Sequence, residues 1–144
     1  GMIILITAGG GAFGGMLQLA GVGDALGELA KATGVTVMVM GFLVASLFKV
    51  AQGSSTVAMI TSAAIVLPVV QATELPYHTV YLAPAIGAGS LVGLWMNDSG
   101  FWVYRTMTGL TEMETLKGKS VMLAVMGCCA FAATLVASTV LPLK

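Results

Sequence analysis

Charged side chains are scarce in this sequence. Only 8% of its 144 residues are Asp, Glu, Lys or Arg, and six positive and six negative side chains leave a net charge of zero. A typical soluble domain carries roughly 25% charged residues, so the scarcity argues against a soluble fold. The zero net charge gives no sign of a nucleic acid or an anionic lipid surface as a partner.

Catalytic side chains are also scarce. The chain has one histidine and two cysteines, and Cys128 and Cys129 are neighbours in an apolar run. Adjacent cysteines rarely pair with each other, and we interpret these two as small buried hydrophobic residues. No metal-ligand spacing and no pairing of a nucleophile with a base appears in the sequence. We therefore expect no metal, no cofactor and no catalytic residues, and a soluble enzyme is the least favoured class.

Apolar residues dominate instead. The sequence is 58% hydrophobic, with 19 glycines, and five apolar stretches cover residues 2–22, 36–51, 57–70, 79–96 and 120–143. Glycine is frequent in transmembrane helices, and the cluster "AGGGAFGG" suits close helix packing better than phosphate binding. This pattern predicts an all-α, multi-pass membrane protein. The start Gly1-Met2 lacks the charged region of a signal peptide, so we interpret the chain as a piece of a longer protein.

The lengths of the stretches predict a hairpin. Residues 120–143 would make a helix of roughly 36 Å, enough to cross a hydrocarbon core of about 30 Å. Residues 57–70 would reach only roughly 21 Å, and a short polar segment separates them from the preceding stretch. We therefore predict that residues 36–70 form a re-entrant hairpin, which enters the membrane and returns to the same side. The alternative is an ordinary loop outside the membrane.

The expected hairpin tip, residues 52–56, reads "QGSST". A hydroxyl of Ser54, Ser55 or Thr56 would accept a hydrogen bond from the first free N–H groups of the helix that starts near Val57. Gly53 would allow a sharp turn and a close approach by a ligand. The positive end of the helix dipole would point at this tip.

A second polar interruption, "LWMNDSGFW", covers residues 94–102. We predict that residues 79–109 form a broken helix, which stops at residues 97–100 and resumes from Phe101. Four consecutive residues there favour turns over helix: Asn97, Asp98, Ser99 and Gly100. In the alternative interpretation, Trp95 and Trp102 form an interfacial belt around a loop at headgroup level.

Three segments in this order, "GGGAFGGMLQLAGVGDAL", "AQGSSTVAMITSAA" and "GAGSLVGLWMNDSGFWVYRTMTGLTEMETLK", resemble the C-terminal part of the gluconate permease (GntP) family. The resemblance covers almost the whole chain. It implies the architecture of the wider ion transporter superfamily, in which two inverted repeats each carry a re-entrant hairpin and a broken helix. This chain would be roughly the second repeat, residues 1–144.

The resemblance also implies a function, which is proton-coupled uptake of gluconate or a related sugar acid or hydroxy acid. One branch of the family takes D-serine. Many relatives have Ser-His-Val before the Asn-Asp pair, where this chain has Leu94, Trp95 and Met96. That departure leaves the exact substrate open, and another small carboxylate or D-serine is the alternative.

Residues and resemblance together predict one site between the two polar breaks. Helix N-termini and hydroxyl donors would hold a carboxylate there. Gln52 and Asn97 would bind sugar hydroxyls. Asp98 would carry the proton, because a charged carboxylate at that depth is costly. Lys49 would either offset the substrate charge or extend its amine toward the headgroups, and we favour the second. The predicted substrate-binding residues are Gln52, Gly53, Ser54, Ser55, Thr56, Asn97, Asp98, Ser99 and Gly100.

Positive charge gathers in residues 103–119, at Arg105, Lys117 and Lys119. The positive-inside rule therefore predicts that this segment is cytoplasmic, in a protein of the inner (plasma) membrane. The expected partners are a small gluconate-like anion, protons, the lipid bilayer, and either a missing N-terminal half or a second copy of the chain. A non-transporting membrane assembly subunit remains an alternative, and a channel is disfavoured because pores use rings of charge.

Overall fold

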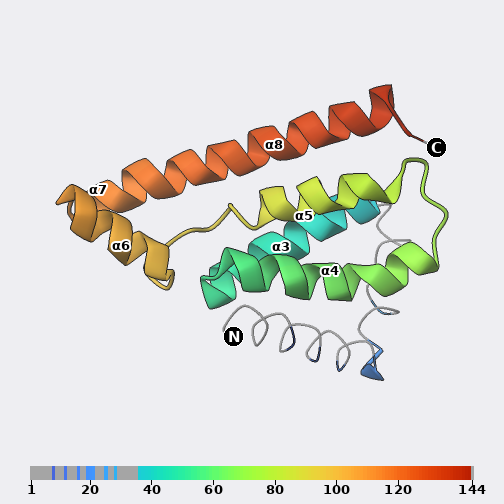
Figure 1. Cartoon of the computed structure of the whole chain (residues 1–144), viewed down its shortest axis with the longest axis horizontal. Coiled ribbons are helices and arrows are strands. Elements are labelled where there is room, and N and C mark those ends of the chain that lie inside the picture. The colour runs from blue at the N-terminus through green and yellow to red at the C-terminus, as the bar shows by residue number, and fades with distance from the viewer. Residues whose placement is uncertain are drawn as a thin grey trace.

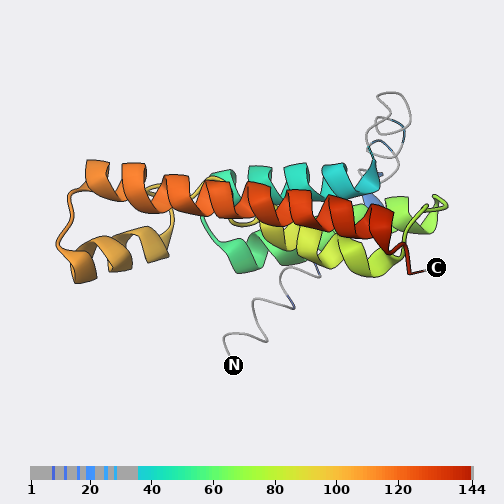
Figure 2. The same ribbon diagram turned by 90° about the horizontal axis from the view of Figure 1, so that it is seen from above.

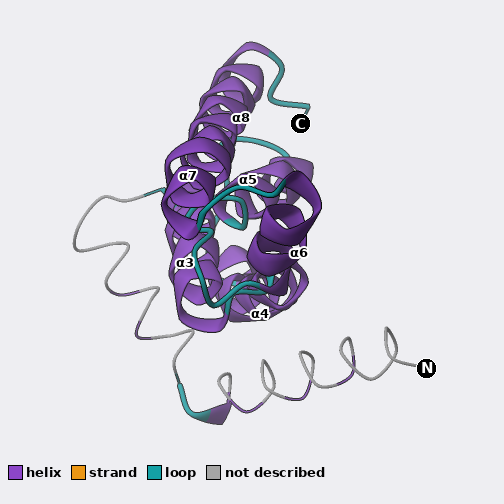
Figure 3. Cartoon of the chain, turned by 90° about the vertical axis from the view of Figure 1, so that its left-hand side faces the viewer, coloured by secondary structure: helices purple, strands orange, loops and turns teal. Residues whose placement is uncertain are grey.

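The computed structural model describes residues 36–143 continuously, together with isolated positions between residues 8 and 28. Within that part of the chain the elements are all helices and their connections (Figure 3). The helical class predicted from composition is therefore confirmed for the described residues. The predicted helix over residues 2–22, with its glycine cluster, lies almost wholly outside them.

The first two described helices, α3 (Val37–Gln52) and α4 (Ser55–Gln71), form an antiparallel hairpin (Figure 1). Gly53 ends α3 in the left-handed conformation, with φ 77°, and its N–H donates to the carbonyl of Lys49 at 2.8 Å. The hydroxyl of Ser54 accepts from the N–H of Val57 at 3.3 Å and caps α4. Two residues between the helices thus suffice to reverse the chain, because glycine adopts the left-handed turn readily.

The next helix stops earlier than the sequence suggested. A short 3₁₀ turn, η1 (Thr79–Tyr81), leads into α5 (Leu82–Gly89), and helix resumes only at α6 (Ser99–Thr108). The predicted stop at residues 97–100 is therefore wrong. The hydroxyl of Ser90 folds back onto the carbonyl of Gly87 at 2.7 Å, and Gly93 has a φ of 90°. A side chain that binds its own backbone and a left-handed glycine both end a helix.

The last helical segment is long. It begins with α7 (Glu112–Thr115), passes through a π-helical stretch, η2 (Leu116–Ser120), and continues as α8 (Val121–Val140). Together these residues, Glu112–Val140, make the one described helix that is long and apolar enough to cross a membrane. It runs alongside the hairpin and α5 and extends beyond the hairpin tip (Figures 1 and 2).

Close backbone contacts hold α5 between α3 and α8. A Cβ atom added at Gly89 would overlap the carbonyl oxygen of Phe42 on α3. One added at Gly127 of α8 would lie 2.6 Å from the carbonyl oxygen of Ala88. Small residues therefore let these helices approach closely, as is common between helices in membranes.

The apolar core lies at the base of the hairpin, which we define as the start of α3 and the end of α4 with the residues packed on them. The Tyr77 hydroxyl accepts a hydrogen bond from the N–H of Met38 at 3.1 Å. The N–H of His78 donates to the carbonyl of Pro142 at 2.9 Å, so the C-terminal end of α8 lies at this base. The cluster contains Val37, Met38, Met40, Val66, Val69, Tyr77, Tyr81, Leu82 and Ala85.

Candidate functional site

The hairpin tip and the irregular segment before α6 lie against each other. A Cβ atom at Gly53 would overlap the backbone oxygen of Asn97, so the two backbones are in contact. The side-chain amide of Asn97 donates to the carbonyl of Val50 at 2.7 Å, and the indole N–H of Trp95 donates to the same oxygen at 2.9 Å. Two breaks that lie far apart in the sequence are thereby fixed together at the last turn of α3.

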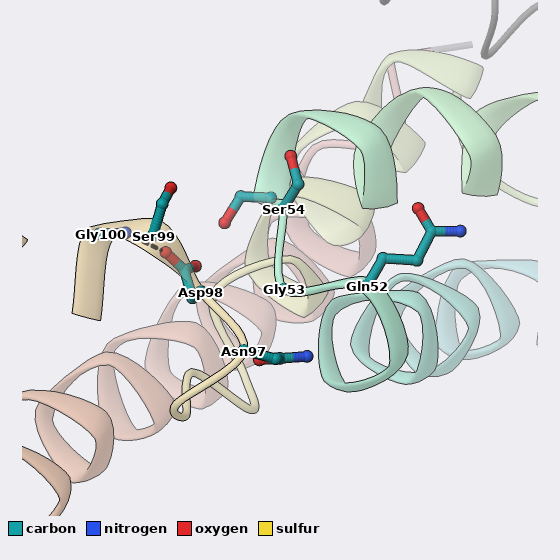
Figure 4. Close-up of a pocket in the computed structure, with 8 residues that line it drawn as sticks. Gln52, Gly53, Ser54, Asn97, Asp98, Ser99 and Gly100 are labelled. Atoms are coloured by element: carbon teal, nitrogen blue, oxygen red, sulfur yellow. Dashed lines mark hydrogen bonds between the residues drawn. The ribbon is translucent and has the colours of Figure 1, made fainter. Parts of the chain in front are cut away.

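A cavity of about 380 Å³ opens where these breaks meet (Figure 4). The structure brings together eight of the nine predicted substrate-binding residues, while Thr56 is exposed and is not among the residues that line the cavity. Whether the cavity binds substrate stays a prediction. The lining residues are Gln52, Gly53, Ser54, Ser55, Asn97, Asp98, Ser99 and Gly100.

The lining side chains differ in what they can offer a ligand. The hydroxyl of Ser55 donates to the carbonyl of Ser90 at 2.9 Å and so ties α4 to the end of α5. The amide nitrogen of Asn97 is held by Val50, which leaves its side-chain oxygen for a ligand. Gln52 is exposed, and its side chain points away from Asp98 (Figure 4). Among the described residues, the hydroxyls of Ser54 and Ser99 line the cavity and donate to no protein acceptor, so both can donate to a ligand.

Two helices begin at this cavity. Ser54 caps α4, and the Oδ1 atom of Asp98 accepts a hydrogen bond from the N–H of Gly100 at 2.6 Å and caps α6. The free N–H groups and positive dipole end of a helix N-terminus attract anions. Asp98 is therefore the cap of α6, but capping is not its only contact.

The second carboxylate oxygen of Asp98 forms an ion pair with the ammonium of Lys49, from the last turn of α3. Lys49 is only 2% exposed and also donates to the carbonyl of Gly53 at 2.8 Å. The favoured interpretation of Lys49, an amine reaching toward the headgroups, is therefore wrong. A buried charge needs a partner of opposite sign, and Asp98 provides it. The sequence feature that could have predicted this ion pair is the presence of one lysine and one aspartate, each at a polar break in an apolar run.

A second lysine reaches the same region from the π-helical stretch. The ammonium of Lys119 donates to the carbonyl of Gly100 at 2.7 Å and lies 4.6 Å from the ring centre of Tyr104. It therefore links η2 to the first turn of α6, and its charge faces the aromatic ring. Sequence reasoning used Lys119 only to assign the side of the membrane and missed this link.

Comparison with known proteins decides the family. The family model described as GntP family permease matches residues 1–140. The chain belongs to the GntP permease family. The resemblance inferred from the three sequence segments is thereby confirmed. No solved structure matches the chain.

Curated relatives of this GntP-family chain are transporters rather than enzymes. It is 38% identical over 130 residues to the low-affinity gluconate transporter of Escherichia coli (strain K12), covering 88% of this chain and 29% of the relative. It is 41% identical over 121 residues to the Gnt-II system L-idonate transporter of the same strain, covering 84% and 27%. It is 36% identical over 115 residues to the gluconate permease of Bacillus subtilis (strain 168), covering 80% and 25%. The chain therefore spans less than a third of the length of these relatives.

Proposed function

We propose that this chain forms the substrate-binding part of a secondary active transporter, which takes up gluconate or a related sugar acid together with protons. The main support for this proposal is the cavity, where two helix N-termini meet the buried ion pair of Lys49 and Asp98. The names of the relatives, gluconate and L-idonate transporters, support a sugar acid as the substrate class.

The cavity chemistry suits such a substrate. A sugar acid has one carboxylate and several hydroxyls. The N-termini of α4 and α6 supply N–H groups for the carboxylate. The hydroxyls of Ser54 and Ser99, the side-chain oxygen of Asn97 and the amide of Gln52 supply partners for the substrate hydroxyls, once Gln52 turns inward. A volume of about 380 Å³ is in the range of small-molecule sites.

The hairpin is proposed to be re-entrant. Helices α3 and α4 have 16 and 17 residues, which correspond to roughly 25 Å each and fall short of the membrane core. The hairpin base and the C-terminal end of α8 lie together, and residues 109–111 lie at the opposite end (Figure 1). This arrangement supports placing residues 103–119 on the cytoplasmic side and the hairpin base on the other side of the inner membrane.

Exposed apolar residues on α8 are proposed to face either lipid or the rest of the carrier. Val121, Met122, Val125 and Met126 are each at least half exposed. Exposed apolar residues that neighbour one another on a helix are typical of a surface that meets lipid or another protein. The occupants we propose are the lipid bilayer, the N-terminal half of the carrier or a second copy of this chain.

The test is transport by the complete carrier that contains this chain, reconstituted in liposomes. We expect labelled gluconate to accumulate above its equilibrium level when an inward proton gradient is imposed, and a protonophore to abolish the accumulation. In Asp98→Asn, accumulation is lost while exchange of preloaded gluconate persists, because the amide cannot take up and release a proton.

The neutral polyol sorbitol serves as the control substrate, and we expect no gradient-driven uptake of it. Absence of gluconate uptake by the unaltered carrier at every pH tested overturns the proposed substrate class. Uphill uptake at the unaltered level in Asp98→Asn shows instead that coupling resides elsewhere in the carrier.

A further inference from the structure

Lys49 lies one layer behind the cavity. Its two partners, Asp98 and Gly53, line the cavity, but Lys49 itself does not. An ammonium has three N–H donors, and among the described residues two of them are taken by these partners. Asp98 therefore covers a buried positive charge at the place where an anionic ligand would enter.

The charges around this point are few. Helices α4 and α5 carry no ionisable acid or base, as their sequences show. Lys119 approaches from η2 and keeps its positive charge, with its ammonium on the carbonyl of Gly100 and beside the ring of Tyr104, but it is partly exposed, so water screens it. Among the described residues, Lys49 and Asp98 are the buried charged groups, and their charges sum to zero.

We infer that the substrate carboxylate, held by the N-termini of α4 and α6, also binds the ammonium of Lys49, and that the substrate and Asp98 exchange places on it. The inference rests on the proposed uptake of a sugar acid. A proton bonds to the Asp98 oxygen that faces Lys49, and the ion pair opens. The Lys49 ammonium keeps its own proton and receives the substrate carboxylate. One O–H bond forms, and no covalent bond within the protein or the substrate breaks.

Charge explains why the proton and the substrate bind together. Before binding, the buried part of the site holds one positive and one negative charge, Lys49 and Asp98. One proton and one carboxylate add a further charge of each sign, so the sum stays zero. A carboxylate arriving alone leaves a net negative charge in a buried site, and a proton arriving alone leaves an unpaired ammonium. Both states are costly away from water, which disfavours binding of either one without the other.

Binding to the complete purified carrier tests this role, with D-gluconate and its neutral analogue D-gluconamide as probes in calorimetric titrations. The unaltered carrier prefers gluconate. In Lys49→Gln we expect gluconate affinity to fall about tenfold or more, to the level of gluconamide, because a charge-assisted contact is lost. Gluconamide affinity stays the same, since it makes no ion pair. Lys117→Gln, an exposed lysine on η2, is the matched control and keeps the preference.

A second variant guards against misfolding. The double variant, Lys49→Gln with Asp98→Asn, removes both buried charges and so leaves neither one unpaired. We expect it to lose the preference for gluconate as well. In Asp98→Asn alone, Lys49 is permanently available. In the unaltered carrier, gluconate affinity rises as pH falls. The affinity of Asp98→Asn therefore equals the highest affinity that the unaltered carrier reaches at low pH, and it does not change with pH.

Three results separate the outcomes. Retention of the gluconate preference in Lys49→Gln overturns the inference while leaving the proposed function intact. Loss of the preference in Lys119→Gln, with Lys49→Gln unchanged, assigns carboxylate binding to the other lysine and also overturns it. Failure of the unaltered carrier to bind any sugar acid overturns the proposed function and the inference that rests on it.

Discussion

The two ends of the α3–α4 hairpin are built from the same kind of helix but are held in opposite ways. At the base, Met38, Val66 and Leu82 are buried in an apolar cluster. At the tip, the contacts are a buried ion pair and hydrogen bonds between side chains and backbone. The base therefore gains its stability from packed apolar surface, whereas the tip depends on matched polar groups.

This difference separates stability from function along one hairpin. Apolar packing at the base does not depend on the charge of a carboxylate or an amine, because the cluster contains neither. A buried ion pair is sensitive to protonation of either member, so a bound proton or anion alters its energy directly. We therefore propose that the tip responds to ligands while the base holds the helices in place.

The largest expected effect comes from leaving one buried charge without its partner. Lys49→Met is expected to destabilise the complete carrier by about 3–5 kcal/mol, because Asp98 stays buried and unpaired. Adding Asp98→Asn should restore most of the loss. Thermal unfolding in detergent measures both variants, and a double variant as unstable as the single one contradicts the explanation.

The matched change at the base is Met38→Ala. Met38 is fully buried, and removing its side chain costs about 2–5 kcal/mol by leaving a cavity. Gluconate affinity, measured in the same preparations, should stay at the unaltered level. A clear loss of affinity in Met38→Ala would show that the two ends of the hairpin are energetically coupled.

An intermediate effect is expected at the turn itself. Gly53 and Gly109 have similar backbone conformations, with φ 77° and 71°, but only a Cβ atom at Gly53 meets neighbouring atoms, those of Asn97. Gly109→Ala therefore costs about 1 kcal/mol of backbone strain. Gly53→Ala costs more, because the tip must also move away from the second break. Equal losses of unfolding stability in the two variants would mean that the contact with Asn97 contributes nothing.

The smallest effects distinguish the three hydroxyls of the tip. Ser54→Ala removes the cap of α4 and costs roughly 0.5–2 kcal/mol. Ser55→Ala loses the hydrogen bond to Ser90 and costs roughly 1 kcal/mol. Thr56 is exposed and makes neither contact, so Thr56→Ala should change stability and gluconate affinity least. A ranking with Thr56→Ala as the most damaging change contradicts the assignment of these roles.

The sequence alone determined the structural class, helical membrane protein, and most of the residues that line the candidate cavity. Scarce charge and long apolar stretches predict membrane helices, because few polar side chains are left to cover a soluble fold. Gly53 and the hydroxyls beside it predict a turn and a cap, because these are local properties of the backbone. Asp98 lies in a segment that the sequence predicts to turn, and its side chain caps α6 by accepting from an N–H group two residues away.

Only the tertiary structure decided the path of the chain after α5 and what Lys49 does. Ser90 and Gly93 end the helix after Gly89, and the segment that follows is held against the last turn of α3, where Trp95 and Asn97 bind the Val50 carbonyl. Lys49 is buried because folding brings Asp98, 49 residues away, to its ammonium. A lysine in an apolar run has two stable outcomes, reaching water or meeting a carboxylate, and the spatial neighbour, which local sequence does not specify, selects between them.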